Sequence, residues 1–201
     1  PVALEENGVR FETDVVGGQK TGWFFDHRDN RAWLNTQVAG KRVLDVFSYI
    51  GGWGVQAAVS GASEVVCVDA SAPALERVTS NAALNGVEDR VSTLQGDAFE
   101  VLAQLKAADE QFDVIVLDPP AFIRKRKDIN VGERAYGKLN REAIRLLGRD
   151  GLAELDALLG IAQRVLKRAL GDAQRLRGDA DASAVQRGHG NLEALAPVSY
   201  T

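Results

Sequence analysis

Between Val43 and about Leu147 the sequence alternates short apolar runs, rich in β-branched residues, with stretches of helical periodicity. This alternation is typical of successive βαβ units, in which crossover helices join parallel strands. It predicts an α/β fold with a mostly parallel sheet and helices on both faces. The runs that we expect to be strands are residues 43–47, 64–69, 91–94 and 112–117.

Helices are expected around these strands. Asn85-Gly86 supplies the left-handed cap that ends a helix, and Pro119-Pro120 prevents the fourth strand from continuing. Residues 8–16 predict a strand or hairpin, and residues 21–38 include a further helix. The other expected helices are one that ends near residue 60 and residues 72–84, 98–107, 138–147 and 153–170, the last from its apolar spacing.

Composition excludes several classes of protein. Of the 201 residues, 45% are hydrophobic and 26% charged, which is typical of a globular chain rather than a disordered one. No apolar run is long enough to span a membrane, and a single cysteine favours a reducing, cytoplasmic setting. A net charge of −4 argues against a globally basic nucleic-acid-binding protein. The chain begins at Pro1 and contains no methionine, so we interpret it as a fragment or an incomplete sequence.

Polar residues or glycines follow each of the four predicted strands. Parallel sheets bind ligands beyond the carboxyl ends of their strands, so these segments predict one ligand site at that edge. They are the segment from Ser48 to Gly54, Asp69, Asp97, and the segment from Asp118 to Phe122.

Each of these residues has a binding interpretation and a structural alternative. Asp69 suits a ribose diol or the start of a helix. Asp97 suits an adenine amine or a helix cap. Asp45, inside an apolar strand, is costly to bury without a partner, which favours a role toward a ligand. Phe122 could stack on a base or belong to the core. The glycines at 51, 52 and 54 admit a ligand close to the backbone or form a tight turn.

The glycine spacing distinguishes between adenosine-containing ligands. A dinucleotide site requires a spaced glycine trio that holds a pyrophosphate at a helix N-terminus. Here the glycines are bunched as Gly-Gly-Trp-Gly, six residues after Asp45, which fits a dinucleotide poorly.

Three segments of this sequence resemble a known family. Residues 45–54 (DVFSYIGGWG) resemble motif I of the class I S-adenosylmethionine-dependent methyltransferases. Residues 19–31 (QKTGWFFDHRDNR), together with residues 118–122 (DPPAF), resemble the RlmI-like family of 23S ribosomal RNA cytosine-5 methyltransferases. The resemblance extends from about Glu6 to Gly151. It implies a Rossmann-like class I methyltransferase fold preceded by a short β-hairpin, with S-adenosylmethionine as cofactor.

The resemblance also implies roles for individual residues. Residues 20–31 would line the donor pocket, and residues 118–122 would receive the target base. Family members usually carry an N-terminal RNA-binding domain of the PUA type, and this chain starts after the point where that domain would end. The cofactor residues implied are Phe25, Asp26, Arg28, Asp45, Phe47, Ser48, Gly51, Gly52, Asp69, Ala70, Asp97, Ala98 and Asp118, and the catalytic ones are Asp118, Pro119, Pro120 and Phe122.

The sequence departs from the family after Gly151. Family members continue there into a fifth strand that ends in a Ser-Cys-Ser nucleophile, because methylation of cytosine carbon 5 needs a thiolate. Here the predicted helix follows directly, and no cysteine follows Cys67, which we expect to be buried. Either residues are missing between Gly151 and Ala153, or the chain is a truncated, inactive variant.

Four function hypotheses therefore remain. The first is methylation of ribosomal RNA, at carbon 5 of a 23S cytosine. The second is methylation of an RNA base nitrogen, which needs no thiolate. The third is an NAD-dependent oxidoreductase, and the fourth a non-catalytic RNA-binding or ribosome-assembly module.

A basic run directly follows the expected base pocket. Arg124, Lys125, Arg126 and Lys127 predict RNA contact through phosphates, or else form a solvated loop.

Neither His27 nor His189 has partners at metal-binding spacing, so we expect no metal. We expect ribosomal RNA as partner and no membrane, and leave a homodimer open. We divide the chain into residues 1–40 with the hairpin, the methyltransferase domain at 41–170, and a tail at 171–201. The positive charge continues at Arg134, Lys138, Arg141, Arg145 and Arg149.

Overall fold

A five-stranded parallel sheet forms the centre of the computed structural model, which describes residues 2–13, 22–123 and 129–155. The strand order is β5-β4-β3-β6-β7, so the chain moves outward from β3 to β5 and then crosses back to β6 and β7. This reversal beside the first strand is the point at which such sheets bind ligands. The strands are β3 (Arg42–Val46), β4 (Glu64–Asp69), β5 (Val91–Gln95), β6 (Phe112–Leu117) and β7 (Leu147–Leu155).

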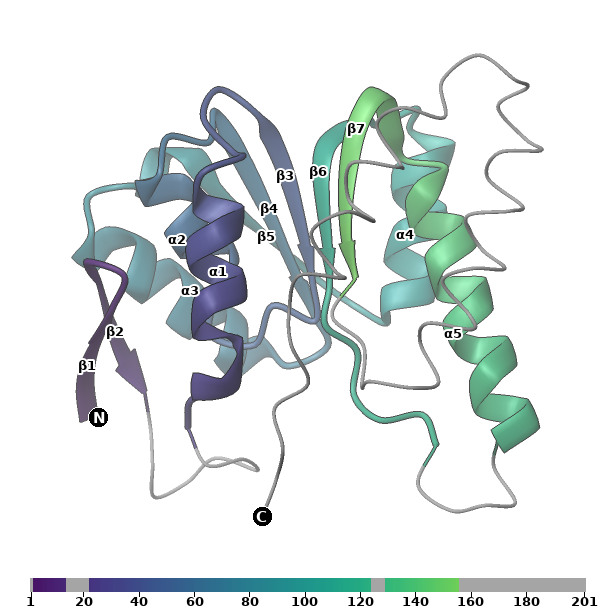
Figure 1. Cartoon of the computed structure of the whole chain (residues 1–201), viewed down its shortest axis with the longest axis horizontal. Coiled ribbons are helices and arrows are strands. Elements are labelled where there is room, and N and C mark those ends of the chain that lie inside the picture. Colours follow the sequence, from purple (N-terminus) through teal and green to yellow (C-terminus); the bar gives the residue numbers. More distant parts are fainter. Residues whose placement is uncertain (1, 14–21, 124–128, 156–201) are drawn as a thin grey trace.

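Helices cover both faces of the sheet (Figure 1). On one face lie α1 (Arg28–Asn35), α2 (Gly54–Val59) and α3 (Ala72–Leu84), and on the other lie α4 (Ala98–Ala107) and α5 (Ile129–Ile144). Two short 3-10 helices, η1 (Phe25–His27) and η2 (Glu88–Arg90), complete the helical elements described. The expected α/β class with helices on both faces is confirmed.

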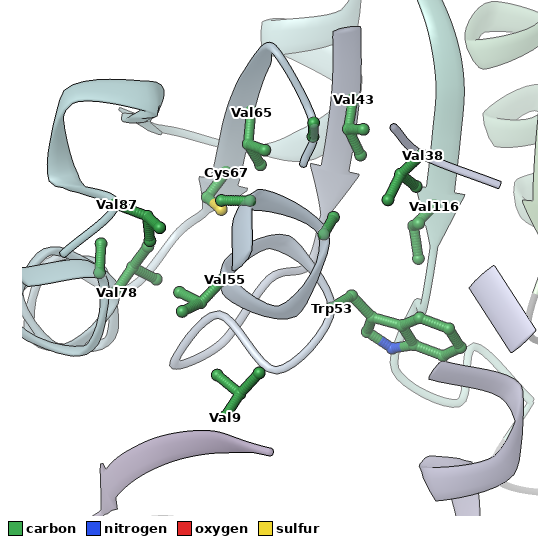
Figure 2. Packing of buried hydrophobic residues seen from close by; sticks show 14 of the residues in the cluster. Val9, Val38, Val43, Trp53, Val55, Val65, Cys67, Val78, Val87 and Val116 are labelled. Atoms are coloured by element: carbon green, nitrogen blue, oxygen red, sulfur yellow. The ribbon is translucent and has the colours of Figure 1, made fainter. Parts of the chain in front are cut away.

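Alternate residues of the strands feed two separate cores, because successive side chains point to opposite faces of a sheet. Val43, Val65, Cys67 and Val116 pack toward α2 and α3, as Figure 2 shows. Their sequence neighbours Leu44, Val66, Val68, Ile115 and Leu117 pack toward α4 and α5. Burial on both faces explains why these strands are almost wholly apolar in sequence.

Local capping signals fix α3 and α4 at the bounds that the sequence predicts. The Ser71 side chain accepts a hydrogen bond from the Ala74 amide at the start of α3. Asn85 is the C-cap of that helix, and Gly86 follows with φ +66°. Asp97 is the N-cap of α4 and accepts from the amides of Phe99 and Glu100. Caps of this kind satisfy backbone groups that a helix leaves unpaired at its ends.

The N-terminal hairpin consists of β1 (Val2–Glu6) and β2 (Val9–Thr13), joined by Asn7 and Gly8. Both turn residues have positive φ, 54° and 77°, as the twist of a two-residue hairpin requires. The expected hairpin is confirmed, although its first strand precedes the residues in which we expected it. The Asn81 side chain of α3 accepts from the Glu12 amide, which attaches β2 to the domain.

The expectation for α5 is wrong at both ends. The sequence predicts a helix over 138–147, whereas α5 begins at Ile129 and ends at Ile144. Gly132, in the first half of this helix, has a low helix propensity and favours a loop. However, Gly132 is buried, and any side chain there would overlap Ile123, so tertiary packing selects glycine inside this helix.

The expectation of a helix over 153–170 is also wrong for residues 153–155. These residues belong to β7, which pairs in parallel with β6. The fifth strand is therefore present, and the direct passage from Gly151 into a helix does not occur. Pairing with β6 satisfies the backbone groups of an otherwise open sheet edge, which outweighs the helix propensity of Ala, Glu and Leu. The rest of the predicted helix, and the tail, lie outside the described residues.

Replacing Gly54 by Ala should destabilise the domain. A Cβ atom at Gly54 would lie 2.5 Å from Cys67 Sγ and 3.1 Å from Asp45 Oδ2. Overpacking of this kind costs about 1–3 kcal/mol, and urea denaturation would measure it. The Cys67→Ala variant gives the control: in a double-mutant cycle it should restore part of the loss. Strictly additive effects would show that the sulfur contact is not the cause.

Candidate active site

The segments that follow β3, β4, β5 and β6 lie against one another at the carboxyl edge of the sheet. The Tyr49 amide donates to Asp69 Oδ2 (2.9 Å), which joins the segment after β3 to the end of β4. The Gly96 amide donates to the Asp69 carbonyl (3.1 Å), and the Asp118 amide to the Val46 carbonyl (3.3 Å). The predicted convergence of these segments on one edge is therefore what the structure contains.

The segment after β3 has an unusual backbone. Phe47, Tyr49 and Gly51 all have positive φ, at 68°, 50° and 84°. For Phe and Tyr this conformation carries strain, and such residues concentrate at functional sites. The amides of Phe47 and Ser48 both donate to the Val68 carbonyl, which holds the segment against β4.

Packing within the protein accounts for the glycines of this segment. A Cβ at Gly51 would lie 2.8 Å from Val55 Cγ2, and one at Gly52 would lie 3.3 Å from the Trp23 ring. Gly54 is enclosed by Cys67 and Asp45. The tight-turn alternative thus has direct geometric support, and close approach of a ligand remains a prediction.

Asp45 is a fully buried carboxylic acid. Its Oδ2 accepts from the Gly54 amide (2.8 Å), while Oδ1 has no hydrogen-bond partner. Burial raises the pKa of Asp45 to about 7, the Gly54 amide opposes the rise, and the charges of Asp118 and Asp69 add to it. Three carboxyl groups from the ends of β3, β4 and β6 therefore interact at this edge.

Two other buried polar atoms of the same segment have no hydrogen-bond partner. They are the Ser48 hydroxyl and the Trp53 indole nitrogen. Buried polar groups are nearly always paired in folded proteins, and here three unpaired ones, counting Asp45 Oδ1, lie within nine residues.

Of Asp69 and Asp97, only Asp97 has the helix-capping role that its structural alternative predicts. Asp69 accepts from Ser71 as well as Tyr49 (both 2.9 Å), but the cap of α3 is Ser71. Asp97 is the cap of α4. Contacts of these two residues, and of the neighbouring Ala70 and Ala98, with a ligand stay predictions.

A buried ion pair fixes the segment that contains the predicted donor-pocket residues. Arg31 on α1 donates to both carboxylate oxygens of Glu6 on β1, at 2.6 and 3.0 Å. The same guanidinium donates to the Phe24 carbonyl (2.6 Å), just before η1. Glu6 also accepts from Trp23 and Gln56. Burial raises the pKa of Glu6, but the bonds from these three side chains outweigh it and hold the pKa below its usual value.

This network places η1 beside the segment after β3. The Phe24 ring lies 6.4 Å from the Tyr49 ring, and the His27 ring 6.0 Å from the Trp53 ring. Phe25, Asp26 and Arg28 are exposed, with Phe25 at 69%. Sequence reasoning missed Glu6 and Gln56, because no local pattern shows that these distant residues contact the predicted donor-pocket segment. Trp23 lies inside that segment.

The predicted base-receiving segment, residues 118–122, is held by α5. The Phe122 amide donates to the Tyr136 hydroxyl (3.1 Å), and their rings lie 4.7 Å apart. Phe122 also lies 6.4 Å from Phe99, which follows the Asp97 cap. Phe122 is half-buried, and its ring packs against the core. The expectation that Phe122 belongs to the core therefore holds for the buried part of its side chain. Sequence reasoning missed Tyr136, which falls in the part of α5 expected to be a loop.

Some predictions fall outside the described residues, among them the basic run Arg124–Lys127. Within the described ranges, no group of three or more His, Cys, Asp or Glu side chains could hold a metal ion. None of the helices in those ranges has the length and apolarity needed to cross a membrane.

The Asp45→Asn substitution should change how stability depends on pH. The pKa of an unfolded aspartate is about 3.8, whereas burial raises the pKa of native Asp45 to about 7. Between these two pH values the native state therefore binds more protons than the unfolded state. The free energy of unfolding should therefore fall as pH rises from about 4 to about 7, by at most about 1.4 kcal/mol per unit. Asp45→Asn should flatten this slope in urea titrations between these values. Exposed Asp109→Asn should leave it unchanged, and an equal slope in all three proteins would contradict the burial argument.

Glu6→Gln should destabilise the domain strongly. The substitution leaves the buried Arg31 guanidinium without its counter-ion, which costs about 3–5 kcal/mol. Thermal and chemical denaturation would measure the loss. Glu5→Gln, one position earlier on the exposed side of β1, is the matched control and should have little effect.

Comparisons with known proteins place this geometry in a family. Residues 2–158 match the family model described as S-adenosylmethionine-dependent methyltransferase. The chain is 40% identical over 181 residues to a ribosomal RNA large subunit methyltransferase I of Shewanella denitrificans, covering 87% of this chain and 46% of that protein. It is 40% identical over 167 residues to the protein of the same name from Aeromonas salmonicida, covering 83% and 42%. The chain thus spans less than half the length of these relatives.

Solved structures agree with the fold. A methyltransferase crystallised in complex with SAH superposes with a TM-score of 0.73 at 25% identity, covering 84% of this chain and 46% of that one. A SAM-dependent methyltransferase from Agrobacterium tumefaciens gives 0.70 at 21% identity, covering 84% and 57%. The predicted Rossmann-like methyltransferase fold and RlmI-like resemblance are confirmed: the chain belongs to the family of S-adenosylmethionine-dependent methyltransferases.

Proposed function

We propose that this chain transfers a methyl group from S-adenosylmethionine to a base of large-subunit ribosomal RNA. The observation that carries the proposal is the group of three carboxyls, Asp45, Asp69 and Asp118, at the switch point of the sheet. The names of the relatives at 40% identity support the RNA substrate.

The charge at this edge suits S-adenosylmethionine better than a dinucleotide. S-adenosylmethionine carries a sulfonium and an ammonium group. The pKa of Asp45 is raised by burial and, in addition, by the charges of Asp118 and Asp69, and a cation near Asp45 would oppose this rise. The pyrophosphate of NAD would bring negative charge to the same place, which is unfavourable. This argues against the oxidoreductase hypothesis.

The buried atoms without a hydrogen-bond partner, Asp45 Oδ1, Ser48 Oγ and Trp53 Nε1, would give the donor further polar contacts. We assign two groups of residues to the donor's methionine part: Asp45, Phe47, Ser48, Gly51 and Gly52 after β3, and Phe25, Asp26 and Arg28 at η1 and the start of α1. Asp69 with Ala70 would hold its ribose, and Asp97 with Ala98 its adenine. The donor supplies an electrophilic methyl group, and the protein residues orient it toward the base.

The segment from Asp118 to Phe122 would present the base to the donor. Its prolines restrict the backbone, and Tyr136 fixes the Phe122 end by a hydrogen bond and a ring contact. Asp118 is close enough to Asp45 to shift the pKa of that carboxyl, so the base side and the donor side adjoin. Holding both reactants in one geometry supplies much of the rate in a transfer of this kind.

The target atom is a finer proposal with two candidates. The resemblance to the RlmI-like family supports carbon 5 of cytosine. The nitrogen alternative is supported by Cys67, the single cysteine of the sequence. Burial, with the charges of Asp45 and Asp69, raises the pKa of its thiol well above the usual value. A buried thiol that resists ionisation is no nucleophile, and methylation of a base nitrogen needs none.

Donor titration and product analysis test the proposal. Isothermal titration should show binding of S-adenosylmethionine and none of NAD. Labelled methyl groups should enter unmodified 23S rRNA, and mass spectrometry of the nucleosides should show 5-methylcytidine or an N-methylated base. Failure to bind the donor would overturn the proposal, and donor binding without transfer to rRNA would leave only the non-catalytic alternative.

Tyr136→Phe tests the base side separately. Loss of one hydrogen bond to the Phe122 amide should lower the transfer rate about tenfold, while donor affinity stays unchanged. Lys41→Gln, exposed at the amino edge of the sheet, is the control and should behave as wild type.

A further inference from the structure

The outward face of α5 carries a row of cationic side chains. Arg134, Lys138, Arg141 and Arg145 are all exposed, and their spacing of four, three and four residues places them within an arc of about 60°. The opposite side of the helix is buried, through Gly132, Leu139, Asn140 and Ala143. The row, which we call the α5 basic face, extends for about 16 Å along the helix axis.

Among the residues that the structure describes, most of this charge has no acidic partner. The glutamates of α5, Glu133 and Glu142, lie outside the arc of the basic face. Glu142 pairs with Arg145 (2.7 Å) and with Lys106 of α4 (3.8 Å). By contrast, Arg134, Lys138 and Arg141 form no ion pair with any carboxylate of the described residues. Arg134 donates its Nε hydrogen to the Asn130 carbonyl, and the Lys138 ammonium lies 5.0 Å from the Phe99 ring centre.

The position of the basic face connects it with the proposed base site. The inner side of the same helix holds residues 118–123, because Tyr136 binds Phe122 and Gly132 packs against Ile123. Lys138 lies over Phe99, which contacts Phe122 as well. The first turns of the basic face are therefore fixed relative to the segment that would receive the base, and its far end points toward the amino edge of the sheet.

We propose that the α5 basic face binds the phosphate backbone of the RNA strand whose base enters residues 118–122. The inference rests on the proposed function and deepens it. Cations that replace the counter-ions of a nucleic acid gain affinity by counter-ion release, even in a chain with a net charge of −4. A base in structured RNA must be splayed out of its stack before it can react. Anchoring the flanking phosphates on the same helix that holds the base segment would orient that base.

A charge-matched pair of variants tests this proposal. The double variant Arg134→Gln/Arg141→Gln removes two cations of the basic face, and Lys41→Gln/Arg90→Gln removes two cations beside the amino ends of β3 and β5. Both change the formal net charge from −4 to −6. Binding of in vitro transcribed, unmodified 23S rRNA would be measured by fluorescence anisotropy across a salt series, with thermal melting to confirm that both variants fold.

We expect the α5 variant to lose affinity about 25-fold at 0.1 M salt, and its plot of log affinity against log salt to become shallower by about 1.4, since each single-strand contact contributes about 0.7. The control should match wild type, and donor affinity should be unchanged in both. Equal RNA binding by the two variants overturns the proposal even if wild type transfers methyl groups. Absence of donor binding or transfer in wild type overturns the proposed function instead, and the anisotropy comparison still decides the role of the basic face.

Discussion

The hydrogen bond between the buried Asp45 carboxylate and the Gly54 amide closes the segment on which the candidate site depends. It requires a carboxyl group inside an apolar layer and a glycine that fits against Cys67. The closed segment comprises the ten residues 45–54, and its backbone passes through positive φ at Phe47 and Tyr49. The Tyr49 amide donates to Asp69 Oδ2, so the segment that Asp45 closes also contacts the end of β4.

A second constraint acts from the other side of the site. The Glu6–Arg31 pair joins the hairpin to α1 and, through the Phe24 carbonyl, to η1. Arg31 also stacks over the rings of Trp23 and Trp53, at 4.9 and 5.6 Å. The hairpin is therefore part of the framework that positions the predicted donor residues, although none of its own side chains is predicted to touch the donor.

The sequence alone predicts those elements whose bounds are determined by residues close to them in the chain. The bounds of α3 and α4 follow from Ser71, Asn85 and Asp97, and β6 from an apolar run that ends at a proline pair. The four polar strand ends are predictable too, because parallel topology alone brings them to one edge. What sequence reasoning misses depends on distant partners: β7 needs the edge of β6, Gly132 needs Ile123, and Glu6 needs Arg31. Propensity and periodicity contain no information about such pairs.

Enclosure of the single thiol has a practical consequence. Cys67 lies on β4 beneath Gly54, fully shielded from solvent. A water-soluble alkylating reagent can reach it only when α2 separates from the sheet, so the labelling rate reports how often that separation occurs. Any compound that bridges the turn after β3 and the end of β4 should slow the labelling. The alkylation rate of Cys67 therefore reports ligand binding at this edge, and no reporter group has to be introduced into the protein.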